Sequence, residues 1–156
     1  MQTPSAKPPV SNGFVSYKNR PAPVPGMKCR VYRNLNSPGY FSVLADEGEF
    51  RGKVLGYAKC VGLTQVSFKV RKSGYRRLQQ ERIRNVHGFA IGTFIGCRAN
   101  PPEELGSSAK RISYHPFKNP FFFDRAEPGD AVHTAPEAWA FGPDLLVPES
   151  QEVKEW

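Results

Sequence analysis

Residues 66–97, VSFKVRKSGYRRLQQERIRNVHGFAIGTFIGC, join two strand patterns through one helix pattern. At the start, apolar Val66, Phe68 and Val70 alternate with polar side chains, which predicts a strand with one buried face. The last twelve residues alternate as well. Their bulky face comprises His87, Phe89, Ile91 and Ile95, and their nearly bare face comprises Gly88, Ala90, Gly92, Phe94 and Gly96.

Glycine weakens a strand unless a bulge, a bend or a close neighbour requires it. Two interpretations of the bare face therefore stay open. The face packs closely against another strand or the preceding helix, which we favour, or it is a floor for a flat ligand or a nucleic-acid backbone. In the second case Arg76, Arg77 and Arg84 would lie above the floor.

Between the two strands the pattern is that of one short helix, with Ser73 as its expected N-cap. On a helical wheel the apolar side chains gather on one side and the basic ones on the other. The first group is Tyr75, Leu78 and Ile83, and the second is Arg76, Arg77, Gln80 and Arg84. We expect the helix to pack through the first group and to present arginines with the second.

Three further strand patterns precede this segment, at residues 28–35, 40–45 and 53–58, and the turns NSPG and DEGEFRG separate them. With residues 66–71 they predict an antiparallel meander of four strands. Shorter strand pieces follow at 111–114, 120–123 and 139–141. We predict an α+β fold that is mostly β: an antiparallel meander or partly closed barrel with one short helix, an extended N-terminal arm and an acidic C-terminal tail.

A length of 156 residues favours one domain. Residues 1–26 contain six prolines and little apolar periodicity, which is typical of a flexible arm. We therefore expect an arm over 1–26, a single β-rich domain over 27–147 and an acidic tail over 148–156. The aromatic run 121–123 is either a core plug or a subunit contact.

Charge is distributed unevenly around a net value of +8. Residues 1–100 carry 17 Lys and Arg against 4 Asp and Glu, while residues 101–156 carry 5 against 10. A basic body favours phosphate-bearing or acidic partners, although solubility alone explains such a balance equally well.

Signal-peptide and membrane-span patterns are missing from the sequence. Cys29, Cys60 and Cys97 are odd in number and form no CxxC pair, which argues against a zinc site or a disulfide scaffold. We expect a soluble protein of the host cytoplasm with no membrane contact, no metal and no cofactor.

Familiar catalytic motifs are missing too: the sequence has no Walker A loop, GxSxG, HExxH or dinucleotide fingerprint. A non-enzymatic protein is therefore the better expectation. Arginine is the suggestive residue, because its planar fork makes paired hydrogen bonds to phosphate. The predicted phosphate-binding residues are Lys69, Arg71, Arg76, Arg77, Arg84, Asn85 and His87. For His87 alone, a partly buried structural histidine is the favoured interpretation.

At VYRNL, GKVLGYA, VSFKV, GYRRLQQERIRNVHGFAIG and ISYHPF, the sequence resembles a family of small proteins of unassigned function found in bacteriophage genomes and related mobile elements. The resemblance covers roughly residues 28–142. This sequence departs from the family pattern at Gly88 and His115, where the pattern has Ala and Asn. The matching positions are Arg33, Asn34, Leu35, Gly52, Lys53, Gly74, Arg77, Glu81, Asn85, Val86, His87, Phe89, Tyr114 and Pro116.

This resemblance implies a phage accessory setting and brings no activity or cofactor with it. Our leading hypothesis is a non-enzymatic protein that binds nucleic acid or a small nucleotide, in a role such as countering host defence. A virion structural protein that uses the arm and the aromatic run for subunit contacts is the alternative. The third hypothesis is a hydrolase or transferase that uses His87 with Glu81 or Asn85. A host protein and a second copy of the chain are further candidate partners.

Overall fold

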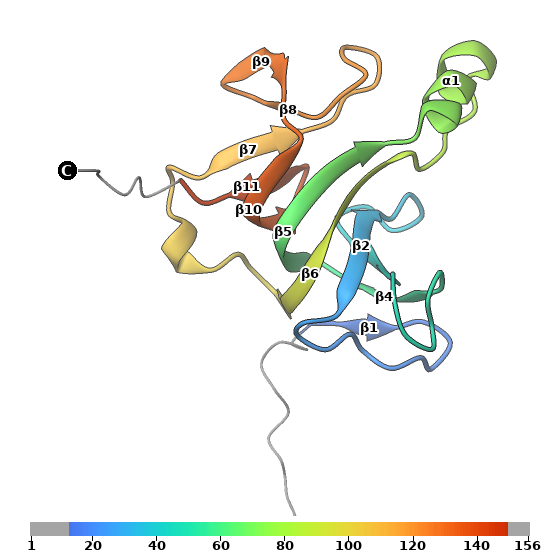
Figure 1. Cartoon of the computed structure of the whole chain (residues 1–156), viewed down its shortest axis with the longest axis vertical. Coiled ribbons are helices and arrows are strands. Elements are labelled where there is room, and N and C mark those ends of the chain that lie inside the picture. The colour runs from blue at the N-terminus through green and yellow to red at the C-terminus, as the bar shows by residue number, and fades with distance from the viewer. Residues whose placement is uncertain (1–12, 150–156) are drawn as a thin grey trace, which may run out of the picture.

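Within residues 13–149, which the computed structural model describes, eleven strands form one antiparallel sheet (Figure 1). Their order across the sheet is β1-β4-β3-β2-β6-β5-β10-β11-β7-β8-β9. The strands are β1 (Val15–Ser16), β2 (Lys28–Arg33), β3 (Phe41–Ala45), β4 (Val54–Ala58), β5 (Cys60–Val70), β6 (Gly88–Arg98), β7 (Lys110–Ser113), β8 (Phe123–Asp124), β9 (Glu127–Ala131), β10 (Thr134–Phe141) and β11 (Asp144–Val147). The helices are α1 (Lys72–Glu81) and a short 3₁₀ turn, η1 (Glu103–Leu105).

The predicted fold class is confirmed: the described chain is mostly β and antiparallel, with one α-helix, and its sheet does not close into a barrel. One pairing differs from the expected meander. Strands β2, β3 and β4 pair in sequence, but β5 pairs with β6 and β10 and not with β4. The fourth strand was therefore predicted in the right place along the chain and with the wrong neighbour.

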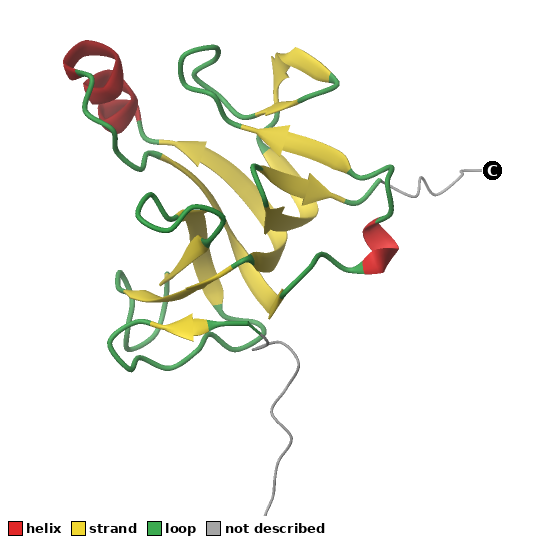
Figure 2. Cartoon of the chain, turned by 180° about the vertical axis from the view of Figure 1, so that it is seen from behind, coloured by secondary structure: helices red, strands yellow, loops and turns green. Residues whose placement is uncertain are grey.

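A single residue, Lys59, joins β4 to β5. In the strand order these two strands are four positions apart, which would be about 19 Å in a flat sheet. The two-residue step from Ala58 to Cys60 spans at most about 7 Å. The sheet must therefore curl until β4 and β5 meet, and the two cartoon views show this curl (Figures 1 and 2).

Strands β5 and β6 run through the middle of the molecule, with α1 at one of their ends (Figure 1). As predicted, Val66 and Phe68 are buried. The bare face of β6 is buried as well: Ala90 and Phe94 belong to the main core. At Gly92 a β-carbon would lie 2.6 Å from the carbonyl oxygen of Thr64, because β5 bulges between Thr64 and Ser67. Close packing of a neighbouring strand, our favoured interpretation, explains this glycine.

Helix α1 begins at Lys72, with Arg71 as its N-cap, and the cap has no side-chain hydrogen bond. The prediction of Ser73 as N-cap is therefore wrong by two residues. The helix contributes no fully buried side chain, although Tyr75 and Leu78 are half-buried. Ile83 lies beyond the helix end and is 39% exposed, so it does not complete the expected packing face.

Gly74 lets α1 lie against the segment that leads into β6. A β-carbon there would come within 2.5 Å of the β-carbon of His87 and 2.6 Å of Asn85 Oδ1. Asn85 also donates a hydrogen bond from Nδ2 to the Gly74 carbonyl over 3.1 Å. A small residue and one amide thus join the helix to His87.

The expected N-terminal arm is part of the fold from residue 13 onward. Strand β1 pairs with β4, and the Phe14 ring packs against the main core beside Gly56. Pro23 is buried, and the Gly26 amide donates to the Phe94 carbonyl over 2.9 Å. Residues 1–12, the rest of the expected arm, lie outside the described residues, as do residues 150–156 of the expected tail.

In the C-terminal third, residues 111–114 and 139–141 fall largely in β7 and β10, as predicted, while β8 begins only at Phe123. The sequence did not predict β9 or β11. Phe122 and Phe123 are buried and Phe121 is half-buried, so the aromatic run is largely a core plug.

We expect Gly92→Val to lower the free energy of unfolding by about 1–3 kcal/mol, because the added side chain would enter the space held by the Thr64 carbonyl. Gly129→Val, on exposed β9, is the matched control, since a β-carbon there meets nothing within 4 Å. It should change stability by less than about 0.5 kcal/mol. Chemical denaturation measures both, and equal effects would contradict the close approach at Gly92.

Phe14→Ala should destabilise the protein by about 2 kcal/mol through lost packing of a half-buried ring against the core. Val24→Ala, in the same segment at a side chain 60% exposed, should have little effect. Thermal unfolding of the two variants measures both effects. If the Phe14 variant melts at the same temperature as the parent, residues 13–26 are a detachable arm.

Candidate functional site

A cavity of about 450 Å³ opens where β2, β6, β7 and β11 meet beside α1 and the loop that follows it. This volume suits a small organic ligand. Most of the wall is apolar or aromatic. The core side chains that line it include Val31, Phe41, Ala90, Ile112, Phe122 and Leu145.

One end of the cavity is formed by His87, which directly precedes β6 and is 3% exposed. Its Nδ1 lies 3.2 Å from the Asn85 carbonyl oxygen and 3.3 Å from Asn85 Oδ1. Within the described residues its Nε2 is buried without a hydrogen-bond partner. Burial lowers the pKa of His87, although the bond to the Asn85 backbone acts in the opposite direction.

Beside His87 lies Tyr114, which directly follows β7. Its ring is stacked on Phe122, with 5.1 Å between ring centroids, and is edge-on to His87 at 5.3 Å. Its hydroxyl is buried and likewise has no partner among the described residues. Burial raises the pKa of Tyr114, so both rings are neutral at pH 7. Unpaired buried polar atoms are rare in native proteins and require an explanation.

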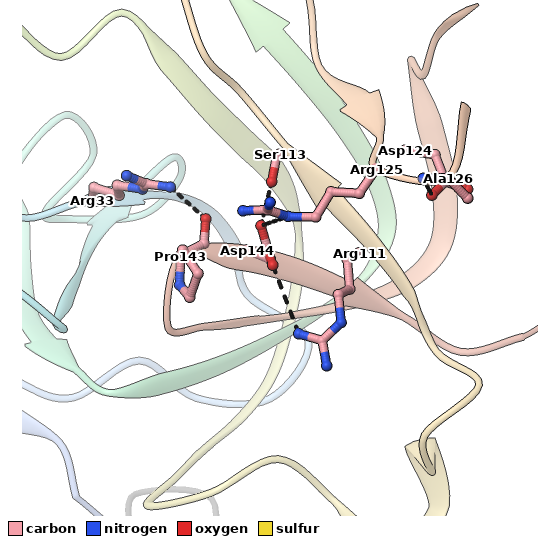
Figure 3. Close-up of polar contacts among 8 residues, drawn as sticks. All are labelled: Arg33, Arg111, Ser113, Asp124, Arg125, Ala126, Pro143 and Asp144. Atoms are coloured by element: carbon pink, nitrogen blue, oxygen red, sulfur yellow. Dashed lines mark hydrogen bonds and ion pairs between the residues drawn. The ribbon is translucent and has the colours of Figure 1, made fainter. Parts of the chain in front are cut away.

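The other end is organised around Asp144, the first residue of β11, whose side chain is 2% exposed (Figure 3). Ser113 donates a hydrogen bond to its Oδ1, and Arg125 Nε donates to the same oxygen over 2.9 Å. Arg111 Nη1 lies 3.8 Å from Oδ2. Next to this group Arg33, at the end of β2, donates to the Pro143 carbonyl across the opening.

Several cations lie around His115, close to this group. His115 has a lowered pKa, first because it is partly buried and then because Arg125, Arg33 and Lys118 lie close to it. Asp144 acts on it in the opposite direction. The carboxylate is thus one anion among several cations. Of these cations only Arg33 lines the cavity, while Arg111 and Arg125 border a separate hollow with Asp124. The cavity consequently has neutral polar atoms at His87 and one cation, Arg33, in its wall near Asp144.

The structure divides the predicted phosphate-binding residues among three places. Arg84, Asn85 and His87 line the cavity. Arg76 borders a shallower hollow beside α1, and Arg77 is exposed with its Nε 3.8 Å from Glu81.

Lys69 and Arg71 lie on the exposed side of β5 and at its end. There Arg71 and Arg30 both lie over the Phe89 ring, at 5.2 and 5.1 Å from its centroid. These residues do not form a single site with Arg84, and a phosphate-binding role for them stays a prediction.

Sequence reasoning from charge did not identify the residues of the Asp144 end, which come from segments far apart in the chain. Arg33 and Pro143, for example, are 110 residues apart. A signal did exist in the family resemblance, since its RNL, NVHGF and YHPF motifs meet at the cavity. The positions of the resemblance that line it are Arg33, Leu35, Asn85, Val86, His87, Phe89, Tyr114 and Pro116.

The three cysteines offer no alternative chemistry. Cys29, Cys60 and Cys97 are free and buried, and burial is the main cause that raises the pKa of each thiol to about 12. Thiols in this state are poor nucleophiles. Across residues 13–149 no three metal-binding side chains cluster. The helices in that range are also too short or too polar to cross a membrane.

These features define a small β protein whose one curled sheet surrounds a ligand-sized cavity. The sequence profile of the family described as Mycobacterium phage L5 gene 82 protein matches residues 23–142. The Gene 82 protein of Mycobacterium phage L5 is 32% identical over 97 residues, which cover 59% of this chain and 73% of that protein. The chain therefore belongs to this bacteriophage protein family. Among solved structures there is no match.

We expect Asp144→Asn to destabilise the protein by about 1–3 kcal/mol, because the neutral amide oxygen accepts from Ser113 and Arg125 more weakly than the carboxylate does. The figure is modest because the Arg111 and Arg125 side chains are 62% and 43% exposed. Asp130→Asn, on exposed β9, is the control. Similar melting temperatures for both variants would contradict a structural role of the buried carboxylate.

Proposed function

We propose that this phage protein binds a small phosphate-bearing ligand, a nucleotide, in the cavity between the His87 and Asp144 ends. The observation that carries the proposal is one ligand-sized cavity with a mostly apolar wall that also contains two guanidinium groups, Arg33 and Arg84. A nucleotide matches this combination, since its base is flat and neutral and its phosphate is anionic.

The phosphate would lie near Arg33, which lines the cavity and is one of the cations close to His115. Guanidinium groups suit this position because they bind phosphate oxygens through paired hydrogen bonds and keep their charge at all relevant pH values. Arg84 is the arginine of the predicted arginine set that lines the cavity.

Binding without turnover is the activity that we propose. The protein would hold a nucleotide in the host cytoplasm and keep it from host proteins that use it, which suits a phage accessory protein that counters host defence. The buried cysteines, with pKa values of about 12, do not supply a nucleophile.

A second candidate is contact with nucleic acid on the exposed side of β5 and β6. It is favoured by the cations near Phe89, where Arg30 and Arg71 flank the ring and Lys69 is paired with Phe89 across the strands. The ring already has two cations over it, which leaves less of it for base stacking. The cavity is therefore the better site. The structural-protein alternative loses one of its proposed contacts, because Phe122 and Phe123 are buried.

Calorimetric titration of the full chain with ribonucleoside mono- and triphosphates and with single-stranded oligonucleotides tests the proposal. We expect nucleotide binding that Arg33→Gln with Lys118→Gln weakens at least about tenfold, since charge-assisted hydrogen bonds contribute about 1.5–3 kcal/mol. The matched control, Lys69→Gln with Arg71→Gln, removes the same charge and should bind nucleotides like the parent.

If the control variant loses oligonucleotide affinity while the cavity variant does not, the ligand is nucleic acid on the exposed side of the sheet. No binding of any phosphate compound would refute both candidates. Thermal unfolding of each variant shows whether lost binding reflects lost folding.

Affinity should also rise as the pH falls through the pKa of His115 in the complex. A bound phosphate offsets the nearby cations that lower this pKa, so binding raises it and protonated His115 favours binding. His115→Gln should abolish the rise. Protonation of the phosphate itself near pH 6 affects both proteins equally, so the difference between their pH profiles isolates the histidine.

A further inference from the structure

We infer that the His87 end of the cavity recognises the edge of a nucleobase, so that the ligand binds with its base inward and its phosphate at the Asp144 end. This inference rests on the proposed function and adds the part of the ligand that is recognised and its orientation. The observation behind it is that His87 Nε2 and the Tyr114 hydroxyl are buried without a hydrogen-bond partner among the described residues.

The side-chain amide of Asn85 determines which ring nitrogen of His87 carries the proton. Asn85 Nδ2 donates to the carbonyl oxygens of Gly74 and Ile83 over 3.1 and 2.9 Å, so the oxygen of the same amide is the atom turned toward His87. Both neighbours of His87 Nδ1, the Asn85 carbonyl and Asn85 Oδ1, are acceptors. Nδ1 must therefore carry the proton, and Nε2 is left as a buried acceptor.

Tyr114, whose ring lies edge-on to His87 with 5.3 Å between the ring centroids, adds a hydroxyl that can donate or accept. The two groups are neutral because burial opposes the charged form of each ring. An uncharged pair of this kind is poorly suited to phosphate. It matches a base edge, on which an N–H donor lies next to a ring-nitrogen or carbonyl acceptor.

Aromatic rings form part of the cavity wall beside these two groups. Tyr114 and Phe122 are stacked with 22° between their planes, and they lie against the start of β6. At Gly88 a β-carbon would lie only 2.7 Å from Tyr114 Cδ2, so the missing side chain lets the tyrosine ring lie flat against the strand. Apolar Val31, Ala90 and Ile112 complete the wall.

The test compares calorimetric titrations of the full chain with the four ribonucleoside monophosphates, ribose 5-phosphate and inorganic pyrophosphate. We expect at least one nucleotide to bind ten times more tightly than ribose 5-phosphate. Tyr114→Phe, which removes one oxygen atom, and His87→Phe should each reduce this preference at least threefold. Neither should change the affinity for ribose 5-phosphate, and His87→Gln, which keeps a polar side chain, should restore part of the preference.

Tyr57→Phe, on β4 away from the cavity, is the control and should bind as the parent does. Equal affinities of the parent for nucleotides and ribose 5-phosphate would overturn the base site and leave the phosphate site intact. An undiminished preference in Tyr114→Phe would also overturn it, whether or not the His87 variants fold. Lack of binding by every compound, pyrophosphate included, would overturn the base site together with the proposed function.

Discussion

The one-residue connection at Lys59 is the constraint on which the rest of the structure depends. It joins β4, next to one edge of the sheet, to β5 in its centre, and a flat sheet cannot satisfy it. The curl that results brings the end of β2 toward the start of β11, where Arg33 donates to the Pro143 carbonyl. The cavity lies at this junction because strand ends from both halves of the sheet converge there while their core side chains stop short of filling it.

The two ends of the cavity differ because different elements supply them. At the His87 end, a helix without a fully buried side chain is held by Gly74 and the Asn85 amide, so the polar atoms there are fixed by main-chain carbonyls. At the Asp144 end, one buried carboxylate gathers guanidinium groups from β7 and the β8–β9 turn. Burial keeps the first end neutral, whereas cations gather near the second. The proposed ligand, apolar at one end and anionic at the other, rests on this difference.

Local patterns in the sequence predicted what depends on near neighbours. The alternation at Val66 and Phe68, the glycine-rich face of β6 and the existence of α1 were all confirmed, because strand and helix periodicity reflects burial along a single element. What depends on pairing between distant segments was missed. Strand β5 has the wrong predicted partner, β1 was assigned to an arm, and β11 was not predicted, since its four residues are too few to show a period.

The residues of the candidate site were also difficult to predict from local sequence, because they come from distant segments. Arg76, Arg77 and Arg84 were predicted to share one face of a helix, yet Arg84 lies beyond the end of α1 and Arg77 lies near Glu81. Arg33 and Arg125 are far apart in the sequence, and the fold brings both close to His115. A cluster of charge along a chain therefore says little about a site. The buried carboxylate of Asp144 holds Arg111 and Arg125 together in space, and the Pro143 carbonyl holds Arg33 beside them. We propose that the positive charge which Asp144 leaves uncompensated there serves an anionic ligand.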